Sequence, residues 1–130
     1  MTGTVERSKP GAGAVLPPPV DAYVRATNAG DLDALMATFA NDALVNDQLC
    51  DHWGKDAIRD WAARDIIGER LRMRVVGSVE HYGQVIVTAQ VDGAFDKRGL
   101  PDPLVLTFYF AAQGDRIVQL MILRNLAGLD

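Results

Sequence analysis

The residue in this sequence best suited to chemistry is Asp47, which lies near the end of a half-apolar, strand-like segment at residues 43–49. Two helical segments precede this segment, and a Trp-containing helix and four strand-like segments follow it, so the carboxylate is expected between helices and a sheet. Burial among apolar groups favours a neutral carboxyl and raises its pKa toward values useful for accepting a proton from carbon. Asp47 is therefore a candidate general base; the alternative is an aspartate that caps the turn after the strand.

His52 is a second candidate, in the short loop expected after Asp47. An imidazole there could orient the carboxylate or relay a proton; the alternative is a half-exposed loop histidine. His81 falls in a predicted hairpin turn and is expected to be exposed. A protein metal site needs about three converging ligands, and only Asp47, His52 and Asp51 are available here, so we expect no metal and no other cofactor.

Composition limits the kind of protein. The chain has 130 residues, 48% apolar and 23% charged, which predicts one folded domain. The net charge of −4 argues against a nucleic-acid partner. The single Cys50 cannot form an intrachain disulfide, which favours the reduced cytoplasm. No apolar run approaches the roughly 20 residues of a membrane span, and residues 1–19 lack the apolar core of a signal peptide.

The chain divides into a Gly- and Pro-rich tail at residues 1–19 and a domain at residues 20–130. Apolar residues at helical spacing and the turn residues between them predict the following elements. Helices are expected at residues 20–28 and 32–39 and between Gly54 and Gly68, and strands at 43–49, 71–79, 84–95, 104–111 and 116–126.

This order of elements predicts an α+β fold, with three N-terminal helices packed on one face of a curved, mostly antiparallel sheet. The strand at residues 104–111 is largely apolar on both faces, with Phe108 and Phe110 on one side and Val105 and Tyr109 on the other. Helices cover one face, and the chain has no further element for the second. A homodimer is therefore expected, formed through the sheet face opposite the helices.

Three segments carry a resemblance to a known family. They are Tyr23 with residues 28–43 (Asn-Ala-Gly-Asp-Leu-Asp-Ala-Leu through Phe-Ala-Asn-Asp-Ala), residues 54–58 with Trp61, and residues 114–118 (Gly-Asp-Arg-Ile-Val). With the order of elements, they resemble the nuclear transport factor 2-like superfamily, and within it the SnoaL-like polyketide cyclase and ketosteroid isomerase branch. The resemblance covers about residues 20–125 and implies a cone-shaped α+β barrel, also called cystatin-like, with a cavity for a small molecule.

The resemblance also implies roles for single residues. Asp47 matches the general base of the isomerases, and Tyr23 matches their oxyanion-hole tyrosine. Where isomerases keep a protonated aspartate, this sequence is expected to have Thr107, whose hydroxyl is a different donor. Arg124 stands where isomerases carry an apolar or aromatic residue. It either points inward and pairs with Asp47 or lies at the sheet edge or dimer interface.

Four aromatic residues are candidate walls of the ligand pocket, although aromatic side chains at such spacings also fill cores. They are Phe39, Trp53, Trp61 and Tyr109. The resemblance implies a protein that binds a small apolar or cyclic molecule and isomerises or cyclises it through Asp47. A non-catalytic binding or interaction module is one alternative, and a cofactor-free dehydratase using Tyr23 and His52 is another, because this fold hosts many functions.

Overall fold

The computed structural model describes residues 15–124, so most of the predicted tail and residues 125–130 lie outside the described part. Its helices are α2 (Pro18–Ala29), α3 (Leu32–Met36) and α4 (Gly54–Trp61), the last continued by a π-helical segment, η1 (Ala62–Ile67). Its strands are β1 (Phe39–Asp47), β2 (Cys50–Trp53), β3 (Arg72–His81), β4 (Gln84–Asp92), β5 (Leu104–Gln113) and β6 (Arg116–Arg124).

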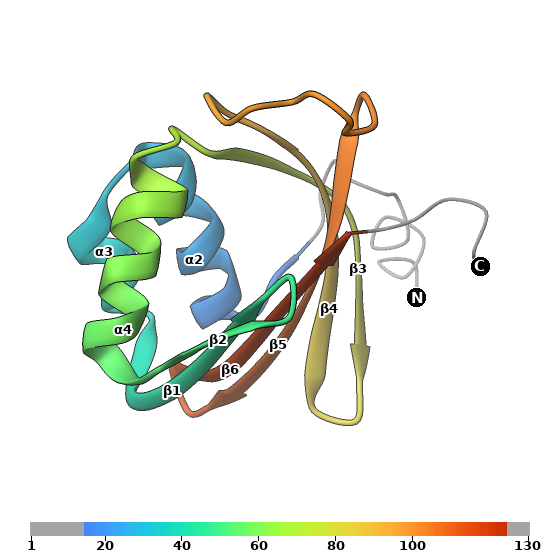
Figure 1. Ribbon diagram of the computed structural model, residues 1–130. Helices are drawn as coiled ribbons and strands as arrows, with labels where there is room; N and C mark the ends of the chain where they lie inside the picture. Colours follow the sequence, from blue (N-terminus) through green and yellow to red (C-terminus); the bar gives the residue numbers. More distant parts are fainter. Residues whose placement is uncertain (1–14, 125–130) are drawn as a thin grey trace, which may run out of the picture.

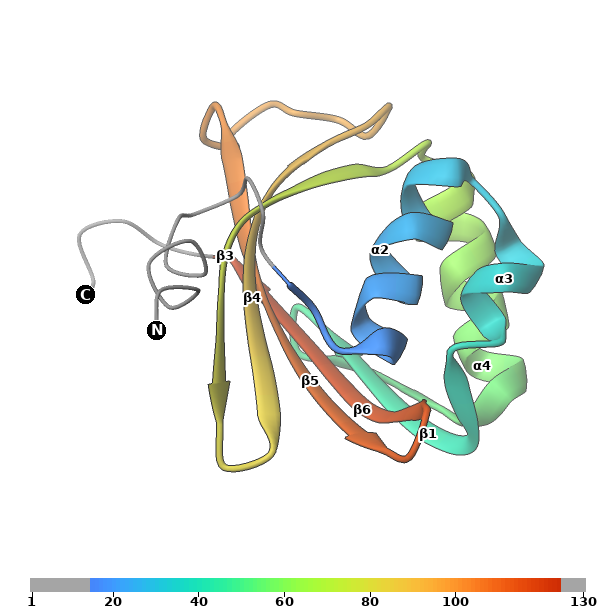
Figure 2. The ribbon, with the colours of Figure 1, turned by 180° about the vertical axis from the view of Figure 1, so that it is seen from behind.

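The six strands form one sheet in the order β2-β1-β6-β5-β4-β3. β1 and β6 run parallel, and the other neighbouring strands pair antiparallel. The sheet curves, and the helices gather on its concave side (Figures 1 and 2). The predicted α+β class is therefore confirmed. In the described part of the chain, no helix is long and apolar enough to cross a membrane.

The boundaries of α2 follow from local chemistry. Prolines occupy its first turn, where their missing N–H groups need no partner, so the helix begins at Pro18, two residues earlier than expected. Gly30 ends it in the left-handed region, at φ 68°, with its N–H directed at the carbonyls of Ala26 and Thr27. Asp31 then accepts a hydrogen bond from the Ala34 N–H at 3.0 Å and begins α3. Gly30 and Asp31 thus take the capping positions that their residue types favour.

The second helix is shorter than predicted. It ends at Met36, and Phe39 opens β1, where it pairs in register with Ile117. The Thr38 hydroxyl donates to the Leu35 carbonyl at 2.7 Å, and the Thr38 carbonyl accepts from the Ile117 N–H at 2.7 Å. The helix was predicted to extend to Phe39 because an apolar residue at this position fits both the helical pattern and a buried strand position. The Phe39 side chain is buried.

The expected loop at His52 is wrong, since residues 50–53 form β2, which pairs with β1. The connecting turn consists of Gln48 and Leu49, which have φ values of 53° and 71°. Two consecutive positive φ angles are typical of the tight hairpin turn that Asn-Gly usually forms. Gln-Leu does not have this sequence signal, so the hairpin could not be predicted from the sequence.

The core lies between the helices and the concave face of the sheet. Alternate residues of the strands point inward, and the helices contribute large aromatic groups. The largest fully buried side chains include Tyr23, Phe39, Trp61, Phe108, Phe110, Leu120 and Val87. This arrangement brings the end of β1 close to α2 and α4.

Asn28, near the end of α2, joins this helix to β3. Its amide donates to the Met73 carbonyl at 2.9 Å and accepts from the Met73 N–H at 2.8 Å. Asn28→Ala is expected to lower the free energy of unfolding by about 1–3 kcal/mol, because two backbone groups of a buried residue lose their partner. Urea denaturation measures this loss. Asn41→Ala, at an exposed site, is the control, and an equally small change in both variants would contradict the role of Asn28.

Candidate functional site

Asp47 is the last residue of β1 and shares the inward side of this strand with the buried Ala43 and Val45. Its carboxylate is half-buried. Oδ2 accepts a hydrogen bond from the Trp61 indole Nε1 at 2.9 Å, and Oδ1 receives a long contact of 3.4 Å from the Gln48 amide. The predicted base therefore faces the helical layer and is held by a buried donor.

Trp61 was predicted as a pocket wall, and the structure makes it the hydrogen-bond partner of Asp47. It is the last residue of α4 and only 1% exposed. The π-helical segment begins at the next residue, Ala62, and such segments occur often at functional sites. The direction of the indole N–H depends on how α4 packs on β1, so no local sequence signal could have revealed this contact.

Tyr23 lies in the middle of α2 and is completely buried. Its ring packs edge-on against Phe39 and Phe110, at centroid distances of 6.1 and 5.2 Å. Neither its hydroxyl nor that of Thr27 has a hydrogen-bond partner within the described residues. Burial strongly raises the pKa of Tyr23, the negative charge of Asp47 raises it further, and the nearby Thr27 hydroxyl opposes this shift. The phenol therefore stays protonated and can donate a hydrogen bond.

His52 lies on β2, where it pairs in register with Val45. Its half-buried ring stacks on Trp61, with centroids 5.9 Å apart and planes inclined by 29°. No hydrogen bond joins His52 to Asp47 in the described part of the chain, so the structure connects the two residues through Trp61. The nearby Asp51 carboxylate accepts from the Asn46 amide at 2.6 Å. Among residues 15–124, no cluster of three His, Cys, Asp or Glu side chains is arranged to hold a metal ion.

Two predicted pocket residues lie on the wrong face of the sheet. Thr107 and Tyr109 alternate with the buried Phe108 and Phe110, so their side chains point away from the helices. The inward positions nearest to Thr107 are Leu106 and Phe108, so the count that placed Thr107 in the pocket was off by one residue. Tyr109 instead borders a shallow depression of about 170 Å³ on the outer face.

The remaining candidates do not join Asp47. Arg124 is exposed and pairs in register with Leu106, and the described ion pairs do not include it, so the structure does not support the alternative in which Arg124 pairs with Asp47. Trp53 is 66% exposed on β2. Phe39 is fully buried and contacts the Tyr23 ring, which makes it part of the core around the site.

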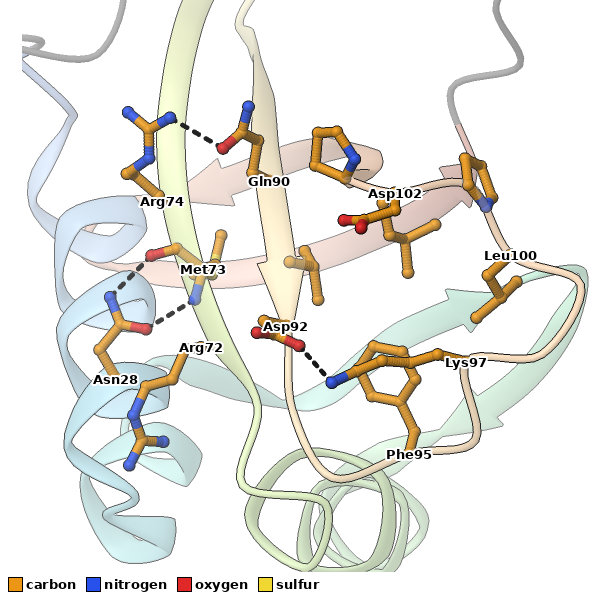
Figure 3. Close-up of a pocket in the computed structure, with 14 residues that line it drawn as sticks. Asn28, Arg72, Met73, Arg74, Gln90, Asp92, Phe95, Lys97, Leu100 and Asp102 are labelled. Carbon is orange, nitrogen blue, oxygen red and sulfur yellow. Dashed lines mark hydrogen bonds and ion pairs between the residues drawn. The ribbon is translucent and has the colours of Figure 1, made fainter.

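A cavity of about 790 Å³ lies elsewhere, between the ends of α2, β3 and β4 and the connection at residues 93–103 (Figure 3). Met73, Val91, Phe95 and Leu104 are among its apolar walls. Much of its polar lining is already paired: Lys97 bonds to Asp92 at 2.7 Å and Arg74 to Gln90 at 2.8 Å, as Figure 3 shows. Its size suits a small molecule. None of the predicted site residues lines this cavity. From the sequence, only turn residues were predicted in this region.

Comparison with known proteins places this geometry in a family. A model described as the SnoaL-like domain matches residues 20–120. A candidate polyketide cyclase of Sinorhizobium meliloti is 33% identical, covers 83% of this chain and 95% of its own, and superposes with a TM-score of 0.74. A protein of Catenulispora acidiphila with a ketosteroid isomerase-like fold, solved with trimethylamine, is 21% identical over 88% of this chain and 91% of its own, with a TM-score of 0.71.

A cystatin-fold protein of Novosphingobium aromaticivorans is 19% identical over 82% of this chain and 95% of its own, with a TM-score of 0.68. A search of curated proteins finds no significant match. The family model covers most of the chain, and the solved structures share its curved sheet and helical layer. The chain therefore belongs to the SnoaL-like domain family of the nuclear transport factor 2-like superfamily.

Proposed function

We propose that this protein binds a small, largely apolar cyclic molecule and that Asp47 acts on it as a general base. The observation that carries this proposal is the Asp47 carboxylate, which faces inward and is held by Trp61 at 2.9 Å near the buried phenol of Tyr23. A carboxylate and a nearby hydroxyl donor are the groups that enolisation requires. The polyketide cyclase description of the 33% identical structure supports the same chemistry.

The chemistry follows from these groups. Asp47 removes a proton from a carbon next to a carbonyl, and the electrons of the broken C–H bond move onto the carbonyl oxygen. The Tyr23 hydroxyl donates a hydrogen bond to the resulting enolate oxygen. Where a C=C bond is conjugated with the enolate, return of the proton from Asp47 to the far carbon of this bond moves the double bond and gives an isomer. Attack of the enolate carbon on a second carbonyl carbon of the same molecule closes a ring instead, and the second carbonyl oxygen takes the proton.

A second candidate function is non-catalytic binding of a small molecule. Two observations favour it: the cavity of about 790 Å³ contains neither Asp47, Tyr23 nor His52, and the Tyr23 hydroxyl is completely enclosed. The neighbour solved with trimethylamine supports small-molecule binding in this fold. The third candidate, a dehydratase using Tyr23 and His52, has less support, because His52 stacks on Trp61 and has no hydrogen bond to Tyr23.

Two variants separate these functions. Leu104→Arg places a charge in the apolar wall of the cavity, and Asp47→Asn removes the base. A panel of enolisable cyclic ketones is tested for binding by calorimetry and for turnover by NMR. The enzyme proposal expects Asp47→Asn to bind the same ketone without converting it. If Leu104→Arg abolishes binding and no panel member is turned over by the wild type, non-catalytic binding is the better account.

We further propose that the outer face of the sheet forms a homodimer. This face has half-buried apolar side chains on β4, β5 and β6, three of the four inner strands, including Ile86, Tyr109, Met121 and Leu123. Light scattering at micromolar concentration is expected to give the mass of two subunits, and Met121→Glu is expected to give one, because a charge there must be buried on association. Leu49→Glu, at an 81% exposed site on the hairpin, is the control. A one-subunit mass for the wild type would contradict the dimer.

A further inference from the structure

We infer that Trp61 is a positioning residue for Asp47, whose carboxylate its indole N–H holds in one orientation. The Nε1 to Oδ2 distance is 2.9 Å, and Trp61 is only 1% exposed, so little water competes for this bond. A hydrogen bond to a charged acceptor is stronger than one between neutral groups. The consequence for proton transfer rests on the proposed function, but the hydrogen bond does not.

The bond also decides which oxygen of Asp47 remains free. Oδ2 is occupied by the indole N–H. The contact of Oδ1 with the Gln48 amide is long, at 3.4 Å, and the same amide nitrogen donates to the Ile122 carbonyl at 3.2 Å. Oδ1 is thus the oxygen with the weaker donor, whereas one lone pair of Oδ2 is firmly engaged. Trp61 therefore selects Oδ1 as the atom that would accept a proton from a ligand.

Several features keep the Trp61 indole in place. His52 stacks on the ring from β2, and the helix changes from α to π geometry directly after Trp61. The helix itself is tied to α3, because the Lys55 ammonium donates to the Met36 carbonyl at 2.7 Å. A donor fixed on a helix in this way is more precise than a loop residue. His52 thus contacts the indole that holds Asp47.

No ion pair among residues 15–124 includes Asp47. The titratable groups that face it are the Tyr23 phenol on α2 and the His52 imidazole beyond the indole on β2. The indole carries no charge, so it holds the carboxylate by hydrogen-bond geometry and not by an ion pair.

The experiment uses the two tryptophans of the chain as a matched pair. Trp61→Phe keeps a large aromatic ring and removes the N–H, whereas Trp53→Phe removes the same group from a side chain that is 66% exposed. The carboxylate carbon signal of Asp47 is recorded by NMR at neutral pH in the wild type and both variants. Trp61→Phe is expected to move this signal, because the carboxylate loses its buried donor, and Trp53→Phe is expected to leave it in place.

A second measurement does not require Trp61→Phe to fold. The indole N–H signal of Trp61 is recorded in the wild type and in Asp47→Asn, with Trp53→Phe used to assign the two indole signals. The Trp61 signal is expected to move in Asp47→Asn, because a hydrogen bond to a neutral amide oxygen is weaker than one to a carboxylate, while the Trp53 signal stays in place. A Trp61 signal insensitive to Asp47→Asn, or an Asp47 carbon signal unchanged by Trp61→Phe, would overturn the inference.

A third readout distinguishes this inference from the proposed function. If the protein converts a ketone, Trp61→Phe is expected to lower kcat with little change in KM, because the base is no longer held in place, and Trp53→Phe is expected to change neither. If the NMR shifts occur but Asp47→Asn leaves turnover intact, Trp61 positions Asp47 as inferred and the general-base proposal fails.

Discussion

Tyr23→Phe is expected to raise the free energy of unfolding by about 1 kcal/mol while lowering turnover by about 10²–10³-fold. The Tyr23 hydroxyl is buried without a hydrogen-bond partner among the described residues, and an unsatisfied buried donor costs about 1–3 kcal/mol. Removing it relieves that cost and leaves the ring contacts with Phe39 and Phe110 in place. The same change removes the proposed oxyanion donor, whose loss typically costs this much in rate. Opposite signs for stability and activity indicate a functional hydroxyl.

Chemical denaturation and ketone turnover on the same preparation measure the two effects. Tyr109→Phe is the control, because Tyr109 lies on the outer face of the sheet, and it is expected to leave turnover unchanged. A loss of stability in Tyr23→Phe would show that the hydroxyl bonds to another group in the folded chain. Unchanged turnover would remove Tyr23 from the chemistry.

The same variant has a consequence at alkaline pH. The folded pKa of Tyr23 is raised above its unfolded value of about 10, first by burial and then by the charge of Asp47. The unfolded chain therefore releases the phenol proton at a lower pH than the folded chain does. The contribution of Tyr23 is fully present below pH ~10 and is lost as pH rises above it. Tyr23→Phe is expected to flatten the fall of stability above pH ~10.

Asp47→Asn is expected to abolish proton transfer, a loss of about 10²–10⁴-fold or more, with little change in folding. The Asn side-chain oxygen can still accept the hydrogen bond from Trp61 Nε1, so the side chain keeps its place. A change of less than about 1 kcal/mol in the free energy of unfolding is therefore expected. Thermal melts and turnover are measured together.

Asp51→Asn is the matched control for this variant. Asp51 lies on the same hairpin, but it is exposed and its carboxylate bonds to Asn46. It is expected to retain turnover. A purely structural Asp47 would give the reverse result, with marked destabilisation and intact turnover in Asp47→Asn.

Most of the fold could be predicted from local sequence chemistry. The caps at Gly30 and Asp31 and the turns between the last four strands follow from residue types that favour those conformations. β2 could not be predicted, because Gln48 and Leu49 form its turn without the usual Asn or Gly. The end of α3 was predicted too late in the chain. Phe39 is apolar and buried, and a further turn of the helix would also require an apolar, buried residue at this position.

The site was predictable in part. The inward side chain of Asp47 follows from the alternation of β1, and the burial of Tyr23 follows from the apolar face of α2. The prediction that Thr107 faces the pocket was wrong, because a one-residue error along a strand moves a side chain to the opposite face. The Trp61 bond and the cavity under residues 93–103 depend on packing between distant segments, which local patterns do not contain.

The central claim is that Asp47 removes a proton from carbon. The most direct measurement is deuterium exchange at the α-carbon of a bound cyclic ketone in heavy water, followed by NMR, because it detects proton abstraction even when the final product is unknown. We expect the wild type to catalyse exchange and Asp47→Asn to exchange at the uncatalysed rate while binding the same ketone. Equal exchange by the wild type and Asp47→Asn would contradict the claim.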